Sequence, residues 1–305
     1  MGRAAAPSPP RRPVRAAFWM ITAQLLFAAM AVGARISGRG VPWQEVCASR
    51  FFVGALTAYA VARARGQSLR IANLRDAWVR SGFGTLAAAG TFFLYAASPA
   101  LALGDAATLM ATSPIFVAIL SLPMLREPIH RTHMVALVLG FGGIALVAQP
   151  TFSTARHLAV IGGLTALSSA LAMIWLRRIG PTESSEAIVL HFALVGLGAT
   201  LLLSIPVWQT PSPRDAAALA ATGLCAGLAQ LAMTRAYALD HAARVSALTY
   251  SGVVFARVLA APFFGEVPDT GQVAGSVLVI GSGILLAAGA RGDGRAEALA
   301  GTAPR

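Results

Sequence analysis

The chain contains a series of apolar segments that are each long enough to cross a membrane as a helix. A span needs about 20 mainly apolar residues, because the hydrocarbon layer is about 30 Å thick and a helix rises about 1.5 Å per residue. Loop backbone would go unpaired in lipid, so the short polar stretches between segments belong at the membrane faces. The pattern predicts an all-α membrane protein with ten transmembrane helices. The ten segments are 16–36, 43–62, 79–101, 104–125, 132–149, 157–177, 186–207, 215–238, 242–264 and 270–290.

The composition argues against a soluble protein of this length. Of the 305 residues, 56% are hydrophobic and only 12% are charged, too few to cover a surface exposed to water. The net charge of +12 does not indicate a nucleic-acid-binding protein, because the arginines lie mainly between the apolar segments and not in one patch. Cys47 and Cys225 lie inside apolar segments without ligand spacing, so we expect no disulfide, no metal site and no cofactor.

The arginines also predict how the chain is oriented in the membrane. If the N-terminus is inside, the outer loops hold just four of the arginines, which are Arg35, Arg39, Arg156 and Arg214. This bias predicts a multi-pass protein of the inner (plasma) membrane with both termini in the cytoplasm. Residues 1–15 then form a disordered tail with nothing to bury, and residues 291–305 form a second tail. The first apolar segment could also be a signal peptide, but its length favours a retained helix.

The first half of the chain reappears in altered form in the second half. Residues 102–148 resemble residues 238–287, with Glu127 falling on Glu266 and Gly142 on Gly281. We therefore expect two repeats of five helices, residues 16–149 and residues 157–290. Because five is an odd number, the repeats insert with opposite orientation, which is the arrangement of carriers that work by alternating access.

Polar and small residues recur at helical spacing on helices one to four and six to nine, which predicts that these eight helices surround a central path. The fifth and tenth helices are rich in glycine and nearly free of polar residues, as expected of packing helices at the edge. For any one small residue, an ordinary helix contact is an equally good explanation. The residues that we expect to contact a substrate are Arg50, Tyr95, Thr112, Trp175, Gln230, Tyr250 and Arg257.

Two arginines lie inside predicted spans, where an unpaired charge is costly. Arg50 is about 10 Å along the helix from the interface, so it either anchors an anionic substrate group or forms a structural ion pair. Arg257 lies mid-span on one face with Tyr250 and Ser246. A guanidinium beside a phenol suits a carboxylate, a phosphate or an aromatic ring.

Other ionisable residues have both a functional and a structural interpretation. Asp105 could carry a coupling proton, or it could stabilise a helix N-terminus. His191 could titrate near neutrality inside the seventh helix, or it could be a neutral buried histidine. Glu127 and Glu266 stand at equivalent turns of the repeats, where we expect them to hold loop amides and not to contact a substrate.

Several stretches resemble the drug/metabolite transporter superfamily, in its branch with two EamA-type domains. They are LLFAAMAVGARI, the arginine of ASRFFVGAL, SPIFVAILSLPMLREP, GFGGIALVAQP and TRAYALDHAARVSALTYSGVVFARVLAAPFFGEVPD. The resemblance runs from about residue 16 to 290 and implies a ten-helix inner-membrane carrier, often an exporter, of amino acids or other small metabolites. It is greatest to a mixed subgroup that includes carriers of S-adenosylmethionine and riboflavin.

The resemblance also bears on single residues. Arg50, Pro114, Glu127, Tyr250 and Glu266 fall on positions that usually hold those residue types in this family. The chain departs from the family pattern where Arg257 replaces a small or neutral residue and Ala260 replaces a glycine. The first departure implies a more acidic substrate than is usual.

The leading functional hypothesis is secondary-active transport of a small polar metabolite, with export favoured over uptake. An amino acid or a related anionic or aromatic compound fits best. The alternatives are a lipid scramblase or a membrane sensor. An intramembrane enzyme is disfavoured, because the chain lacks GxSxG, HExxH and paired interior histidines, so no catalytic residue is assigned. Membrane lipid is an expected partner, nucleic acid is not, and a homodimer remains open.

Overall fold

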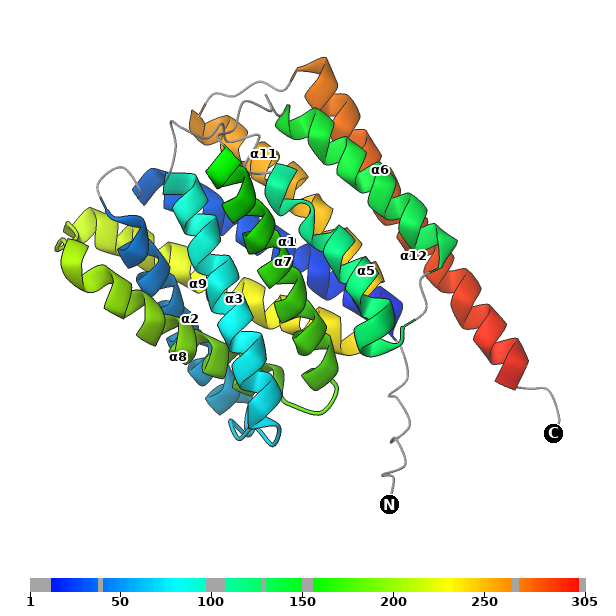
Figure 1. The fold of residues 1–305 in the computed structure, drawn as a ribbon, viewed down its shortest axis with the longest axis horizontal. Helices are drawn as coiled ribbons and strands as arrows, with labels where there is room; N and C mark the ends of the chain where they lie inside the picture. Colours follow the sequence, from blue (N-terminus) through cyan, green and yellow to red (C-terminus); the bar gives the residue numbers. More distant parts are fainter. Residues whose placement is uncertain are drawn as a thin grey trace.

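We describe a computed structural model of the chain, which covers residues 12–37, 41–96, 108–127, 130–149, 156–264 and 269–301. The described residues form helices and connecting turns, with no strand among them. Figure 1 shows the helices as a bundle of long, roughly side-by-side rods. The helices are α1 (Pro13–Ser37), α2 (Trp43–Arg65), α3 (Leu74–Ala96), α5 (Ser113–Leu125), α6 (Arg131–Ala148), α7 (Arg156–Ile179), α8 (Ser185–Ser204), α9 (Pro213–Leu239), α10 (Ala242–Ala247), α11 (Ser251–Phe264) and α12 (Thr270–Gly301), with short 3₁₀ helices η1 (Ile205–Val207) and η2 (Leu248–Tyr250).

The helix lengths and compositions confirm an all-α membrane protein. Seven helices in the described ranges are long and apolar enough to cross a membrane. The apolar part of α12, Thr270–Leu286, is shorter than these. Helix α3 is as long as α2 but begins five residues before its predicted span, so that it also includes Arg75 and Asp76. The ninth predicted span is divided among α10, η2 and α11. The count of ten spans therefore stays a prediction.

Local signals in the sequence set several helix ends. The Ser184 hydroxyl accepts a hydrogen bond from the Ala187 amide and begins α8, and Ser212 caps α9 in the same way, followed by proline at the first helical position. Helix α2 ends at Gly66, whose φ of 63° lies in the left-handed region that glycine adopts without strain.

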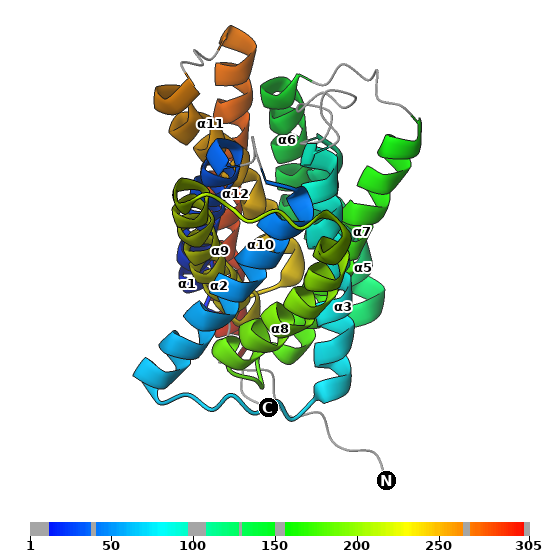
Figure 2. The ribbon, with the colours of Figure 1, turned by 90° about the vertical axis from the view of Figure 1, so that its left-hand side faces the viewer.

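The packing of the helices has a two-fold pattern. The helices that correspond in the predicted repeats are α1 and α7, α2 and α8, α3 and α9, α5 and α10–α11, and α6 and α12. Three contacts in one half have a counterpart in the other. The contact of α1 with α9 corresponds to that of α7 with α3, and the contact of α2 with α9 corresponds to that of α8 with α3. The contact of α1 with α11 corresponds to that of α7 with α5. Three further pairs, α2 with α8, α6 with α12 and α5 with α10, each join corresponding helices. In Figure 2, α2 and α8 cross in front of α1 and α9 on one side and α3 and α7 on the other.

The fourth and ninth predicted spans are both interrupted at corresponding places. In the fourth, the Thr112 hydroxyl donates to the Leu109 carbonyl at 2.6 Å before α5 begins with a proline in its first turn. In the ninth, the Thr249 hydroxyl donates to the Ser246 carbonyl at 2.6 Å within the 3₁₀ turn of η2. Hydroxyls that bond to a carbonyl three residues earlier compete with the helical ladder and favour such breaks.

Glycine allows α6 and α12 to pack closely along one edge of the bundle, as expected from their sequences (Figure 1). A Cβ atom at Gly143 would lie 2.7 Å from the Gly275 carbonyl oxygen, and one at Gly275 would lie 2.5 Å from the Gly143 carbonyl oxygen. The neighbouring Gly142 has open space at the same position. The two backbones are therefore in contact where neither residue carries a side chain.

Gly143→Ala is expected to destabilise the protein, because the added methyl group meets backbone that cannot move aside without separating α6 from α12. Overpacking of this kind costs about 1–3 kcal/mol. Gly142→Ala is the matched control, and it should leave the apparent Tm in detergent unchanged or raise it, because alanine favours a helix over glycine. Equal melting temperatures for the two variants would contradict this account of the seam.

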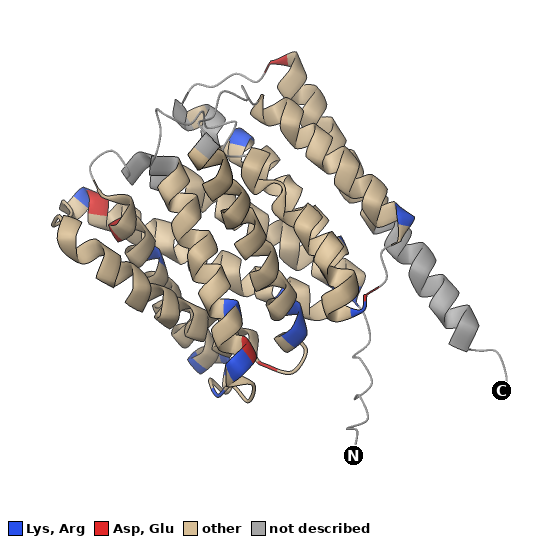
Figure 3. Ribbon diagram, in the orientation of Figure 1, with Lys and Arg blue, Asp and Glu red and all other residues tan. Residues whose placement is uncertain are grey.

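The polar connections gather at the two ends of the bundle. At one end, here called the inner end, the Arg12 amide donates to the Leu239 carbonyl and the Ser184 hydroxyl donates to the Ser68 carbonyl. At the opposite, outer end, the Gln209 amide donates to Glu45 and the Gln149 side chain donates to Asp269. In Figure 3 the charged residues lie mainly toward the helix ends, and the middle of the bundle is nearly free of them.

Candidate functional site

A small cavity, called the central cavity below, lies where α2, α8 and α9 meet. Its volume is ≈ 10 Å³, about enough for one water molecule. Helices α2 and α9 approach closely beside it, because a Cβ atom at Gly227 would lie only 3.1 Å from the Gly54 Cα atom. The cavity is therefore narrow beside these glycines. Its lining residues are Arg50, Phe51, Gly54, Val189, Phe192, Ala193, Ala226, Gly227 and Gln230.

Arg50 brings a positive charge to the wall of this cavity. It lies on the third turn of α2, and its guanidinium carbon is 5.4 Å from the centre of the Phe51 ring and 5.9 Å from that of Phe92. These contacts are within range of a cation–π interaction, which stabilises a cation without neutralising it. The charge therefore stays available to an anion that enters the cavity.

Gln230 adds an amide to the lining of this cavity from α9. Its side chain is buried on α9, and its Nε2 atom has no hydrogen-bond partner among the described residues. A buried amide nitrogen without an acceptor is unfavourable, so it favours a ligand that supplies one. Arg50 and Gln230 are the two residues of the sequence-based prediction that line this cavity together.

Arg80 is a buried cation that the sequence analysis does not single out. Its predicted span begins at residue 79, which places Arg80 at the membrane face, whereas α3 begins at Leu74 and carries Arg80 into the bundle. The guanidinium carbon lies 3.9 Å from the centre of the Phe192 ring, which also lines the cavity. The signal in the sequence is that Arg80, Gly84 and Ala88 share one face of a continuous helix.

The arrangement suits the binding of an anionic or aromatic group. Arginine offers a planar set of donors to a carboxylate or phosphate, and rings stack on guanidinium planes and on one another. Phe51 and Phe192 meet edge to face with their centres 5.1 Å apart. Across the described residues there is no group of His, Cys, Asp and Glu that could hold a metal ion.

A second, wider cavity lies at the inner end of α1, α8 and α9. Its volume is ≈ 290 Å³, and its lining residues are Arg15, Trp19, Ser185, Arg235, Ala238 and Leu239. Arg235 already donates to Glu186 at 2.5 Å and stacks on the Trp19 ring at 4.9 Å. The paired charge makes this cavity a weaker candidate for an anion than the central one.

The structure places the predicted residues Trp175 and Thr112 outside the lining of the central cavity. The Trp175 indole donates to Asp76 at 3.2 Å, and Arg178 contacts the other oxygen of the same carboxylate at 3.2 Å. These contacts join the end of α7 to the start of α3. The Thr112 hydroxyl donates to the Leu109 carbonyl at the break before α5.

Tyr250 and Arg257 also lie away from the cavity, and so the structure does not bring Arg257 together with Arg50. Tyr250 is buried in η2 against Gly140 of α6, and its hydroxyl has no hydrogen-bond partner in the described part of the chain. Arg257 is half-buried on α11. Hydrogen bonds from Gln272 and Gln149 lower the pKa of Asp269, and the charge of Arg257 contributes in the same direction.

The remaining predicted residues are only partly described. His191 shares a 2.9 Å hydrogen bond with Ser81 and meets the Trp78 ring edge to face, in the seam between α3 and α8. Asp105 and Glu266 lie outside the described residues, as does the side chain of Tyr95.

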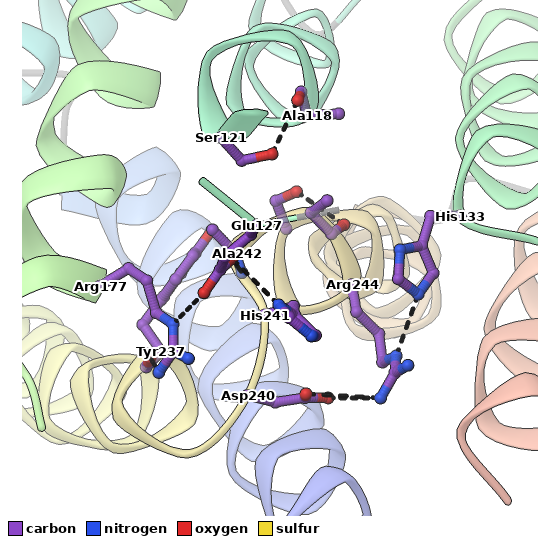
Figure 4. Close-up of polar contacts among 12 residues, drawn as sticks. Ala118, Ser121, Glu127, His133, Arg177, Tyr237, Asp240, His241, Ala242 and Arg244 are labelled. Carbon is purple, nitrogen blue, oxygen red and sulfur yellow. Dashed lines mark hydrogen bonds and ion pairs between the residues drawn. The ribbon is translucent and has the colours of Figure 1, made fainter. Parts of the chain in front are cut away.

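Glu127 lies at the centre of a buried polar cluster at the inner end (Figure 4). Arg177 donates to one carboxylate oxygen at 2.7 Å, the Ala242 amide donates to the other at 2.8 Å, and His241 lies 3.4 Å from that second oxygen. Burial favours a raised pKa for Glu127, but the contacts with His241, Arg177 and the Ala242 amide outweigh it and lower the pKa to about 2. The carboxylate is thus ionised and joins the α5–α6 turn to α7 and α10.

Arg244 makes a second connection within the same cluster. It pairs with Asp240 at 3.0 Å and donates to the His133 ring at 3.2 Å (Figure 4). Like Glu127, His133 belongs to the first half of the chain and bonds to residues of the second. The cluster therefore holds the two halves together at the inner end.

The sequence matches a known family over nearly its whole length. A sequence profile described as the EamA-like transporter family matches residues 14–149 and, again, residues 158–288. The chain belongs to this family. Membership identifies it as a transporter of the drug/metabolite type and not as an enzyme.

Similar proteins support the EamA assignment. The chain is 29% identical to the pseudopaline exporter CntI of Pseudomonas aeruginosa, over 85% of this chain and 91% of that protein. It is 25% identical to a riboflavin transporter of Vibrio cholerae over 88% of this chain and 91% of that protein, and 26% identical to an S-adenosylmethionine uptake transporter of Rickettsia prowazekii over 55% and 57%. A crystal structure that is 18% identical has the same fold, with a TM-score of 0.78 over 92% of this chain and 99% of that one.

Proposed function

We propose that the protein is a secondary-active transporter that moves a small anionic metabolite across the inner membrane by alternating access. The substrate class is an amino acid or a related compound with a carboxylate, and an aromatic group would fit the rings beside Arg50. The observation that carries this proposal is the small central cavity, which Arg50 and Gln230 line together with two phenylalanine rings.

The two-fold packing pattern supports alternating access. In carriers built from inverted repeats, the substrate site lies at the repeat interface, and discontinuous helices in corresponding positions accompany it. Here α2 and α8 correspond and pack on each other beside the cavity, and the fourth and ninth spans break at corresponding positions. We infer that residues 16–149 and 157–290 are the two repeats and that the cavity opens to one side at a time.

The predicted topology agrees with the distribution of connections. The segments that we expect in the cytoplasm, including 66–73 and 180–184, contact one another at the inner end of the bundle. We therefore assign the inner end to the cytoplasm and place both termini there. The relatives include an exporter and an uptake carrier, so family membership leaves the direction open. We favour export, because the family that the sequence resembles often contains exporters.

Counterflow in proteoliposomes tests this proposal. Vesicles that contain the purified protein and are preloaded with unlabelled amino acids or aromatic carboxylates should accumulate the matching labelled compound in a saturable way. Protein-free vesicles are the control. Folded protein that gives no counterflow with any compound of these classes would contradict the proposal, and movement of a dye-labelled lipid without such flux would favour a scramblase.

A further inference from the structure

Arg80 is the most deeply buried charge in the described part of the chain that lacks a polar partner. Its exposed fraction is 1%, and none of its three side-chain nitrogens has a hydrogen-bond partner among the described residues. Asp76, one turn earlier on α3, is already engaged by Arg178, Trp175 and Asn73. The guanidinium carbon lies over the face of the Phe192 ring, 3.9 Å from its centre.

Such an environment is costly for an arginine. The guanidinium stays charged at any physiological pH, so it cannot relieve the cost by losing a proton. A single cation–π contact offsets only part of the desolvation of a buried charge, and five N–H donors remain unsatisfied. A group that is so poorly compensated in the ligand-free protein points to an acceptor that arrives during the working cycle.

The surroundings connect Arg80 to the central cavity. Arg50 lies against Phe51, Phe51 meets Phe192 edge to face, and Arg80 covers the face of Phe192. The two guanidinium groups therefore lie at the two ends of one pair of phenylalanine rings. Gly84 gives this arrangement its space, because a Cβ atom there would lie 2.8 Å from the Phe192 ring and 3.4 Å from Arg80.

We propose that Arg80 is a second anion-binding group of the central site and that the substrate is a small organic dianion. One anionic group binds Arg50, the other binds Arg80 once the Phe192 ring turns aside, and the middle of the molecule lies against the rings. This inference rests on the proposed transport function and narrows its substrate class from an anion to a dianion. In this proposal, the Phe192 ring separates the cavity from Arg80 until it turns aside.

Ligand-induced thermal shifts of the purified protein in detergent test the proposal. The probes are glutarate and terephthalate, which carry two carboxylates, and butyrate and benzoate, which carry one. The parent protein should be stabilised at concentrations of dianion at least about tenfold lower than of monoanion, since one added charge pair that is buried contributes that much or more. Arg80→Met should abolish this difference, and Arg75→Met, an exposed arginine on the same helix, should retain it.

The melting temperature without ligand separates a binding role from a structural one. Removing an uncompensated buried charge should leave the Tm of Arg80→Met unchanged or raised, whereas loss of a structural partner would lower it. A lowered Tm with an unchanged preference for dianions would overturn the proposal. If Arg80→Met does not fold, Arg80→Gln, which keeps a donor but no charge, is judged by the same preference.

The same measurements separate failure of this inference from failure of the proposed function. If mono- and dianions stabilise the parent equally and counterflow occurs, only the second anion-binding group is wrong. If no probe stabilises the folded parent and no counterflow is found, both the dianion site and the transport of anions are contradicted.

Discussion

Arg50→Gln is expected to lower flux in proteoliposomes by about 100-fold and to leave the fold intact. Loss of one member of a buried, hydrogen-bonded charge pair costs about 2–5 kcal/mol, and every 1.4 kcal/mol corresponds to a tenfold change in binding. Among the described residues, the Arg50 guanidinium contacts two phenylalanine rings and no carboxylate. Its removal therefore leaves no buried carboxylate without a counter-charge. The effect should therefore appear in substrate binding and flux and not in the melting temperature.

Two further variants sharpen this prediction. Arg50→Lys keeps the charge but loses the planar donors and the stacking, so it should retain more flux than the glutamine variant and still fall below the parent. Arg63→Gln, an exposed position nearer the end of α2, should behave as the parent. If Arg50→Gln keeps its flux, the central cavity is not the substrate site. If it fails to fold, Arg50 is a structural residue.

The sequence was sufficient to predict the helices and their approximate limits. Long apolar segments leave few alternatives in a membrane, and most of the described helices overlap the segments predicted from the sequence. The glycines of the fifth and tenth predicted helices indicate packing helices at the edge, and in the structure Gly143 and Gly275 form a close contact between the two. These features depend on neighbours in the sequence.

The break in the ninth span and the burial of Arg80 could not be predicted in the same way. Residues 242–264 form one mainly apolar segment, and the 3₁₀ turn within it arises from hydroxyl bonds to particular carbonyls. Arg80 follows Arg75 and Asp76, so its segment has the composition of a polar loop until the packing of α3 on α8 is known. A local pattern does not specify which helix covers a charge.

The candidate site was predictable only in part, for a related reason. A polar stripe predicts that a helix face is covered, but it does not identify the covering group. Gln230 faces the cavity, whereas Trp175 faces the carboxylate of Asp76 and Tyr250 faces α6. All three side chains satisfy the same expectation from the sequence. Their different neighbours depend on pairings between helices that lie far apart in the chain.

Glu127→Gln is expected to produce the largest loss of stability among the substitutions considered. The carboxylate accepts from Arg177 and from the Ala242 amide, and it contacts His241, so a neutral amide would leave Arg177 buried without its counter-charge. Breaking a buried pair in this way costs about 3–5 kcal/mol. The apparent Tm in detergent should fall well below that of the parent. Asp215→Asn, at an exposed helix cap, should change the stability by about 0.5 kcal/mol or less.

The lowered pKa of Glu127 also makes the stability of the protein depend on pH. The pKa of Glu127 is lowered in the folded protein from 4.5 to about 2, so its contribution is fully present above about pH 4.5 and is lost as the pH falls toward 2. A shift of this size corresponds to on the order of 3 kcal/mol. The parent should lose this stability between those two pH values, and Glu127→Gln, which has no carboxylate to protonate, should show a smaller loss over the same interval.

Melting curves of both proteins at several pH values between 2 and 7 decide the matter, with Asp215→Asn as the reference for a carboxylate removed from the surface. If the melting temperatures of Glu127→Gln and the parent fall in parallel as the pH is lowered, the loss of stability comes from other carboxylates. If Arg177→Met restores stability to the Glu127→Gln background, the cost lies in the unpaired guanidinium, as the geometry predicts, because the double variant no longer buries a charge. The cluster would then contribute chiefly by holding the α5–α6 turn against α7 and α10, since an apolar pair of similar volume could replace its charges without loss of the fold.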